Sequence, residues 1–194
     1  MRLVFVPSAP FLLPGLGGGP PELRAAIDAA LSTLDGPVTV LGAGAFDGPV
    51  TGSVDATPWG AAGKPSRDPL PLALAVGASL LGDRPRRLLG TTGKAHQLSG
   101  SVLVVGDGTA KRTEKAPGHF DPRAEGFDQA VDAALRHGDA AALAALDPLL
   151  AQELWVGGLA AWQTVGLCAP GPWRGEVNWS GSPYGVHYVV ATWD

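Results

Sequence analysis

The sequence predicts a single α/β domain over residues 1–194, with a central mixed β-sheet and helices on both of its faces. A strand, a helix and a second strand follow one another over residues 3–41, and such a unit has parallel strands and a right-handed crossover by default. A strong apolar strand follows at residues 101–106. The length of 194 residues fits one domain, which buries roughly 70% of the surface that its unfolded chain exposes.

The first strand is expected at residues 3–6, where the chain is apolar and rich in β-branched and aromatic residues. Residues 20–22, Pro-Pro-Glu, predict a helix start, because proline is tolerated in the first turn and an acid there faces the positive end of the helix dipole. A Gly-Pro pair at residues 36–37 ends this helix, and residues 38–41 form the second strand. The apolar face of the helix comprises Leu23, Ile27, Leu31 and Leu34.

The middle of the chain begins with a long segment, residues 42–69, that has no sustained period. Its Gly, Pro, Ser and Asp content predicts a surface excursion with a short edge strand at residues 52–55. Helical spacing returns at residues 70–81. Residues 87–90 predict a weak strand, ahead of the strong one at residues 101–106.

Three helices and two strands are expected in the last third. Asp121-Pro122 has the form of an N-cap followed by a proline at the first helical position, and Asp139 is expected to cap the next helix, residues 140–146. Pro148 opens a third helix that carries both Trp155 and Trp162. These two tryptophans are seven residues apart, so on one helix they would share a face that could support an interface. The closing strands are expected at residues 176–179 and 186–191.

Composition excludes several classes of function. The formal charge is 14 − 18 = −4, and the only basic cluster is Arg84, Arg86 and Arg87, so nucleic-acid binding is not expected. The single cysteine, Cys168, excludes an intrachain disulfide and a cysteine-based zinc site, and fits a reducing, cytoplasmic location. Prolines interrupt the apolar N-terminus, and no stretch approaches the roughly 18 apolar residues of a membrane span, so neither a signal peptide nor a membrane partner is expected.

Four motifs occur in a fixed order along the chain. They are Pro7-Ser8-Ala9-Pro10 with Leu13-Pro14, the stretch from Gly106-Asp107 to Phe127-Asp128, the segment of residues 153–166, and Ser182-Pro183-Tyr184-Gly185-Val186-His187-Tyr188-Val189-Val190-Ala191. Together they resemble the class III extradiol ring-cleavage dioxygenases, catalytic B subunit, and their Memo-like relatives. The resemblance covers nearly the whole chain, and it implies the extradiol dioxygenase B-subunit fold.

The resemblance also implies where an iron site would lie. Members that cleave catechol-type rings hold Fe(II) with two imidazoles and one carboxylate, and a further histidine acts as acid and base. Carried over residue by residue, the two histidine ligands fall on Ser8 and Gly44, the acid/base histidine on Ala110, and the last ligand near Gly157, with Glu153 one turn earlier. These positions lack metal-binding side chains apart from the hydroxyl of Ser8, so the chain is expected to hold no metal and no cofactor and to have no catalytic residue.

The resemblance leaves three functions open. The first is a metal-free relative that retains a cleft for a small aromatic or carboxylate ligand, or for a protein partner, lined by Ser8, Gly44, Asp107 and His119. The second is an active Fe(II)-dependent ring-cleavage dioxygenase. The third is a structural or oligomerisation module, because the tryptophan-rich helices and the closing strands could form a homo-oligomer.

The remaining candidate residues have alternative interpretations. The four histidines, His96, His119, His137 and His187, are not spaced as metal ligands; His137 is expected at a helix C-terminus and His187 within a strand. Asp107, at the end of a strand, could bind a ligand hydroxyl or cap a turn. Arg112 is expected on a solvated face, together with Lys111, Glu114 and Lys115. The glycines of residues 15–19 superficially suggest a phosphate cradle but lack the Lys-Ser/Thr of a P-loop, so a flexible loop is the alternative.

Overall fold

Seven strands form one mixed sheet in the computed structural model, which describes all residues from 1 to 194. The order across the sheet is β3-β4-β2-β5-β1-β7-β6. The strands are β1 (Arg2–Val6), β2 (Val38–Ala43), β3 (Gly48–Pro49), β4 (Arg86–Thr91), β5 (Ser101–Val105), β6 (Gly175–Gly181) and β7 (Tyr188–Trp193). The helices are α1 (Pro21–Ser32), α2 (Leu72–Leu81), α3 (Arg123–His137), α4 (Ala140–Ala144), α5 (Pro148–Glu153) and α6 (Leu159–Cys168), with 3₁₀ turns η1 (Pro10–Leu12) and η2 (Thr57–Trp59).

The four central strands β4, β2, β5 and β1 are parallel, and antiparallel strands flank them on both sides. β1 and β2 are parallel as predicted, but they are not neighbours, because β5 lies between them and pairs with both. All five residues of β5 are buried, as expected for a parallel strand that is covered on both faces. The predicted α/β class with a central mixed sheet is therefore confirmed.

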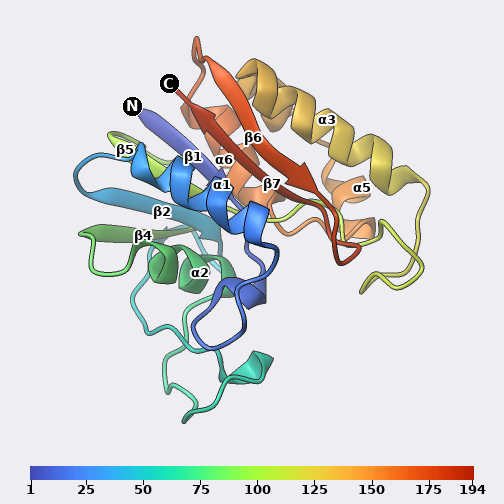
Figure 1. Cartoon of the computed structure of the whole chain (residues 1–194). Helices are drawn as coiled ribbons and strands as arrows, with labels where there is room; N and C mark the ends of the chain where they lie inside the picture. Colours follow the sequence, from blue (N-terminus) through green and yellow to red (C-terminus); the bar gives the residue numbers. More distant parts are fainter.

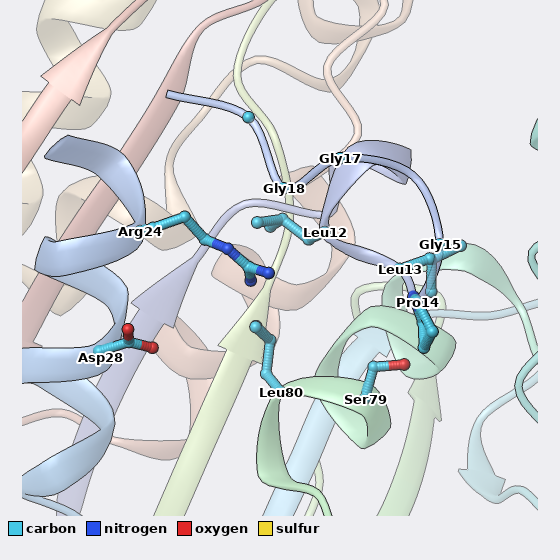
Figure 2. A pocket seen from close by; sticks show the side chains of 11 residues that line it. Leu12, Leu13, Pro14, Gly15, Gly17, Gly18, Arg24, Asp28, Ser79 and Leu80 are labelled. Atoms are coloured by element: carbon cyan, nitrogen blue, oxygen red, sulfur yellow. The ribbon is translucent and has the colours of Figure 1, made fainter. Parts of the chain in front are cut away.

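Helices cover both faces of the sheet, as predicted (Figure 1). Helices α1 and α2 lie over one face, and α3 to α6 lie over the other. The loop between β1 and α1 passes close to α1 and α2 at the carboxyl end of the parallel strands (Figure 2). No helix combines the length and the apolar character that a bilayer crossing would need.

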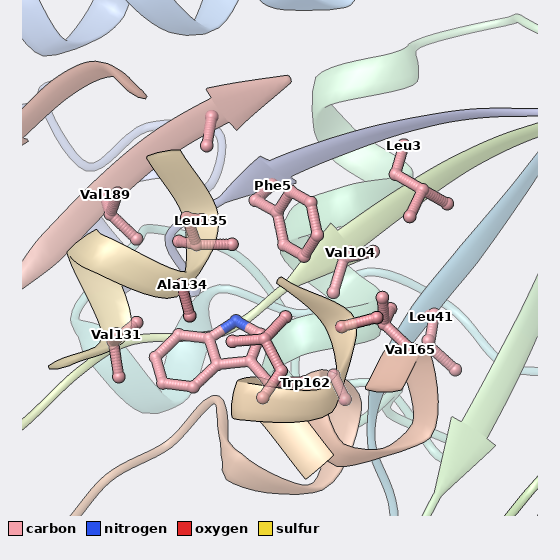
Figure 3. Close-up of a cluster of buried hydrophobic side chains, with 14 of the residues drawn as sticks. Leu3, Phe5, Leu41, Val104, Val131, Ala134, Leu135, Trp162, Val165 and Val189 are labelled. Atoms are coloured by element: carbon pink, nitrogen blue, oxygen red, sulfur yellow. The ribbon is translucent and has the colours of Figure 1, made fainter. Parts of the chain in front are cut away.

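The alternation of side chains along β1 and β5 divides the core into two clusters. Val4 and Leu103 face α1 and α2, whereas Phe5 and Val104 face the second layer of helices. In that second layer Trp162 of α6 is fully buried, and its ring lies near Val131 and Ala134 of α3 (Figure 3).

Several predicted elements differ from the structure. The edge strand lies at Gly48–Pro49 rather than at residues 52–55, where Ser53 makes only an isolated bridge to Pro69. His187 precedes β7 instead of lying within it. Helix α3 starts at Arg123 and not at Pro122, and the Asp121 carboxylate accepts the backbone N–H of Arg123.

The long helix predicted from Pro148 is wrong, because the chain breaks between α5 and α6. Trp155 has a φ of 59° in this break, and its side chain is exposed, while Trp162 is buried in α6. The two tryptophans therefore share no helix face. Two glycines in this break, Gly157 and Gly158, lie against the chain that leaves β5, at Asp107 and Gly106 respectively.

Gly106, just after β5, packs closely against Gly158 at the start of α6. A Cβ atom on Gly106 would overlap the Cα of Gly158, and the N–H of Gly158 donates to the Asp107 carbonyl at 2.7 Å. Backbone atoms cannot move aside as a flexible side chain can. Glycine at position 106 is therefore a steric requirement of this packing.

We expect Gly106→Ala to destabilise the protein by about 1–3 kcal/mol or more, because the added methyl group must displace backbone. Gly126→Ala is the matched control: it lies in α3, a Cβ there meets nothing within 4 Å, and alanine favours the helix. The control should be neutral or more stable by about 0.4–1 kcal/mol. Urea unfolding of both variants measures the difference, and equal stabilities would contradict the packing described.

Candidate functional site

A cavity of about 420 Å³ lies at the carboxyl ends of β1 and β5. We call it the Asp107 cavity. Ligand sites of α/β sheets typically form at this end of the strands, because loops there diverge above the sheet. The walls are mostly apolar or aromatic and comprise Pro10, Phe11, Leu16, Trp59, Asp107, Pro117, Tyr184, Val186 and Tyr188.

Ser8 and Asp107 lie side by side at the base of this region. The Ser8 N–H donates to Asp107 Oδ1 at 2.7 Å, and its hydroxyl donates to Oδ2 at 2.9 Å. Ser8 follows the end of β1, and Asp107 follows the end of β5. These two strands are parallel neighbours in the sheet. The pairing of the two strands therefore brings together residues that are 99 positions apart in the sequence.

Burial dominates the electrostatics of Asp107. It raises the pKa of this carboxyl to about 6, although the two hydrogen bonds from Ser8 and the nearby His187 imidazole act in the opposite direction. Burial also raises the pKa of Tyr188, and the negative charge of Asp107 adds to that effect. At neutral pH the cavity thus holds a carboxylate that readily takes up a proton and a phenol that remains protonated.

Aromatic rings form one wall of the cavity. The Phe11 ring packs edge-on against Tyr184 and against Tyr188, with 5.5 Å between ring centroids in each pair. The Trp59 ring, 38% exposed, lines the same cavity from the long segment between β2 and α2. Edge-to-face pairs of this kind are a favourable arrangement of aromatic rings.

A buried carboxylate positions the loop that carries Asp107. Asp128, in α3, is 1% exposed and accepts the N–H of Thr109 at 2.9 Å, the Thr109 hydroxyl at 2.7 Å and an Arg112 guanidinium N–H at 3.1 Å. A Cβ on Gly108 would lie 2.7 Å from Asp128 Oδ1, so only glycine fits there. Arg112, expected on a solvated face, instead reaches inward to this carboxylate.

His187, just before β7, connects the loop after β5 to the antiparallel pair of β6 and β7. Its side chain is 3% exposed and lies between two carboxylates, 3.5 Å from Asp128 and 3.2 Å from Asp132. The Ser180 hydroxyl donates to Asp132 at 2.6 Å and lies 3.1 Å from the imidazole. Hydrogen bonds from His187 and Ser180 help hold the pKa of Asp132 below its usual range despite burial, which by itself would raise it.

The structure brings together only some of the predicted site residues. Ser8, Asp107 and Gly157 converge, since a Cβ on Gly157 would lie 3.8 Å from both Ser8 Oγ and Asp107 Cβ. Gly44 lies beyond β2, packed against Gly90, and is not part of the cavity wall. His119 is exposed, has a φ of 58° and does not line the cavity either.

The residues at the expected iron positions do not fit an iron centre. Ala110 is buried beside the Leu154 carbonyl, and neither it nor Gly44 nor Gly157 carries a donor atom in its side chain. Glu153 is exposed and pairs with Arg123 at 2.7 Å. No group of three or more His, Cys, Asp or Glu side chains is arranged to hold a metal ion.

The aromatic wall was missed by reasoning from the sequence. Tyr184 and Tyr188 flank a turn in the closing motif, and their spacing of four residues gives no sign that both meet Phe11. Trp59 lies in a segment without any period. Only the turn from β6 to β7 and the course of the loop after β1 bring these rings together.

We predict that Asp107 makes the protein less stable as pH rises from about 4 to about 7. The folded state holds a proton on this carboxyl up to pH of about 6, whereas the unfolded chain loses it near 3.8, so folding becomes less favourable across this interval. Asp107→Asn removes this dependence and keeps an acceptor for the Ser8 N–H. The variant should gain stability relative to the parent with rising pH, by at most about 3 kcal/mol.

Thermal unfolding of both proteins at several pH values provides the measurement. The comparison with the variant is needed because Asp121, whose pKa is lowered to about 2 by hydrogen bonds from Arg123, contributes the opposite slope in both proteins. A difference in stability that does not change with pH would contradict the raised pKa of Asp107.

The buried Asp128 carboxylate should be costly to remove. We expect Asp128→Ala to destabilise the fold by about 3–5 kcal/mol, because it leaves the Thr109 donors and the Arg112 guanidinium without their acceptor. Asp128→Asn, which retains one acceptor oxygen, should cost less. Denaturant unfolding of the two variants checks this order, and an alanine variant as stable as the asparagine variant would show that the contacts with Thr109 contribute little.

No protein-family model matches the chain, and a search of curated proteins finds no significant similarity.

Proposed function

We propose that the chain is a divergent relative of the class III extradiol dioxygenases that binds a small aromatic molecule without an iron centre. The observation that supports this most is an aromatic-walled cavity whose main polar group is the Asp107 carboxyl. Small-molecule sites are typically of this kind, largely apolar with a few well-placed polar groups. The order of the four sequence motifs supports the family assignment.

The protonation of the cavity indicates the chemistry of its ligand. Above a pH of about 6, Asp107 is an acceptor with negative charge, and the protonated Tyr188 is a donor. A phenol-type ligand matches both groups, since its hydroxyl can donate to Asp107 while its ring packs against Phe11. An aromatic carboxylate is repelled by the charged Asp107 and binds well only where Asp107 is protonated.

Ring cleavage is not part of this proposal. The reaction needs a metal that binds the catecholate and dioxygen together, and the side chains of Ala110, Gly44 and Gly157 offer it no ligand. Of these residues only Gly157 lies beside Asp107, and it adds no side chain to that region. The cleft is thus suited to binding and proton exchange with a phenolic ligand.

The test is a calorimetric titration with catechol and with benzoate at a pH of about 5 and a pH of about 7.5. We expect catechol to bind the parent protein at the higher pH and benzoate to bind preferentially at the lower pH. Asp107→Asn should remove the pH dependence for both ligands. Asp83→Asn, the same change in charge at an exposed position outside the cavity, should leave both affinities unchanged.

Two outcomes would overturn the proposal. The first is the absence of binding by either ligand at both pH values. The second is stoichiometric retention of Fe(II) by anaerobically prepared protein together with opening of the catechol ring, which would establish an active dioxygenase.

A further inference from the structure

A second cavity, of about 560 Å³, lies on the α1 and α2 side of the sheet (Figure 2). The loop of residues 12–19 forms one wall, and Arg24 and Asp28 of α1 and Ser79 and Leu80 of α2 form the others. We call it the Arg24 pocket. It has no lining residue in common with the Asp107 cavity, so conclusions about it do not depend on the proposed function.

The backbone of the glycine loop, residues 15–19, has free donors. Within the protein, the N–H groups of Gly15, Gly17 and Gly19 have no backbone or side-chain acceptor, whereas that of Gly18 donates to Phe11 at 2.9 Å. All four glycines have φ between 72° and 84°, a region that other residues rarely adopt. A Cβ on Gly19 would also overlap the Phe11 ring, so this residue is held against a packed side chain.

Arg24 places a positive charge against this loop. A Cβ on Gly18 would lie 3.2 Å from Arg24 Nε, and the side chain extends from α1 towards Leu12 and Leu80 in the middle of the pocket (Figure 2). The guanidinium forms no ion pair and no hydrogen bond with another protein group, unlike those of Arg112 and Arg123. An unpaired guanidinium is a strong donor for the oxygens of an anion.

Ser79 supplies an independent sign of an unsatisfied polar site. Its hydroxyl oxygen is shielded from solvent and has no hydrogen-bond partner. The hydroxyl points across the pocket wall towards Pro14 (Figure 2). A shielded polar group without a partner costs free energy that a ligand oxygen or a bridging water can recover.

The start of α1 contributes little to this site. Pro20 and Pro21 have no N–H group, and Glu22 adds a negative charge to the first turn. Any attraction for an anion must therefore come from the loop glycines and Arg24 rather than from the helix dipole. Asp28, exposed and one turn after Arg24, also faces the pocket and weakens the attraction.

We propose that the Arg24 pocket binds the phosphate group of a small organic phosphate. The free donors of Arg24 and of the glycine loop match phosphate oxygens in charge and in hydrogen-bonding type. The pocket volume exceeds that of a bare phosphate, and Leu12 and Leu80 provide apolar surface for the organic part. Phosphate is favoured over carboxylate, because it carries more acceptor oxygens and more negative charge for a guanidinium and several unpaired N–H groups to bind.

The test uses phenyl phosphate, inorganic phosphate and benzoate in titrations followed by ¹H–¹⁵N spectra at low ionic strength. Phenyl phosphate should shift the amide resonances of Gly15, Gly17 and Gly19 saturably, and more tightly than inorganic phosphate. Arg24→Gln should weaken this binding about tenfold or more. Asp28→Asn should strengthen it, because it removes a repelling charge.

Arg136→Gln is the matched control, because Arg136 is an exposed arginine near the end of α3, on the opposite face of the sheet. Its affinity for phenyl phosphate should equal that of the parent protein. If Arg24→Gln and Arg136→Gln lose the same affinity for phenyl phosphate, the effect comes from net charge alone and the proposal is overturned. Absence of saturable shifts, or tighter binding of benzoate than of phenyl phosphate at these glycines, would also overturn it.

Discussion

The buried Asp128 carboxylate is the interaction on which the candidate site depends. A carboxylate that is 1% exposed must have its oxygens satisfied, and Thr109 and Arg112 supply the donors. This requirement ties α3 to the loop after β5 and fixes the direction in which Asp107 leaves the sheet. It also explains why residue 108 is glycine, since no Cβ fits between Asp128 and His187.

The loop after β5 also carries Asp107, whose carboxyl is fully hydrogen-bonded and yet easily protonated. Ser8 satisfies its two oxygens, yet burial still raises its pKa to about 6, so the carboxyl is poised to change charge near neutral pH. Such a group lowers the stability of the folded state at neutral pH. Perturbed carboxyls of this kind are enriched at functional sites, although structural networks also produce them.

The chain between β1 and α1 separates two cavities of different chemistry. Phe11 and Leu16 point into the aromatic Asp107 cavity, while the glycines of residues 15–19 and Leu12 line the Arg24 pocket. A short segment can serve both because the 3₁₀ turn and the positive φ angles reverse its direction within a few residues. Its glycines are thus explained by backbone shape, whichever ligand either cavity binds.

The sequence by itself determined the α/β class, the three strands that begin near residues 2, 38 and 101, and the parallel direction of the first two, because apolar periodicity and helix signals are local. It also placed Ser8 and Asp107 at strand ends. It did not determine that β5 lies between β1 and β2. Nor did it determine that the helix predicted from Pro148 breaks at Trp155 into α5 and α6. Those outcomes follow from contacts between distant segments, such as Gly106 against Gly158. Only the tertiary structure decided that Ser8 bonds to Asp107 and that the aromatic rings line the same cavity as Asp107.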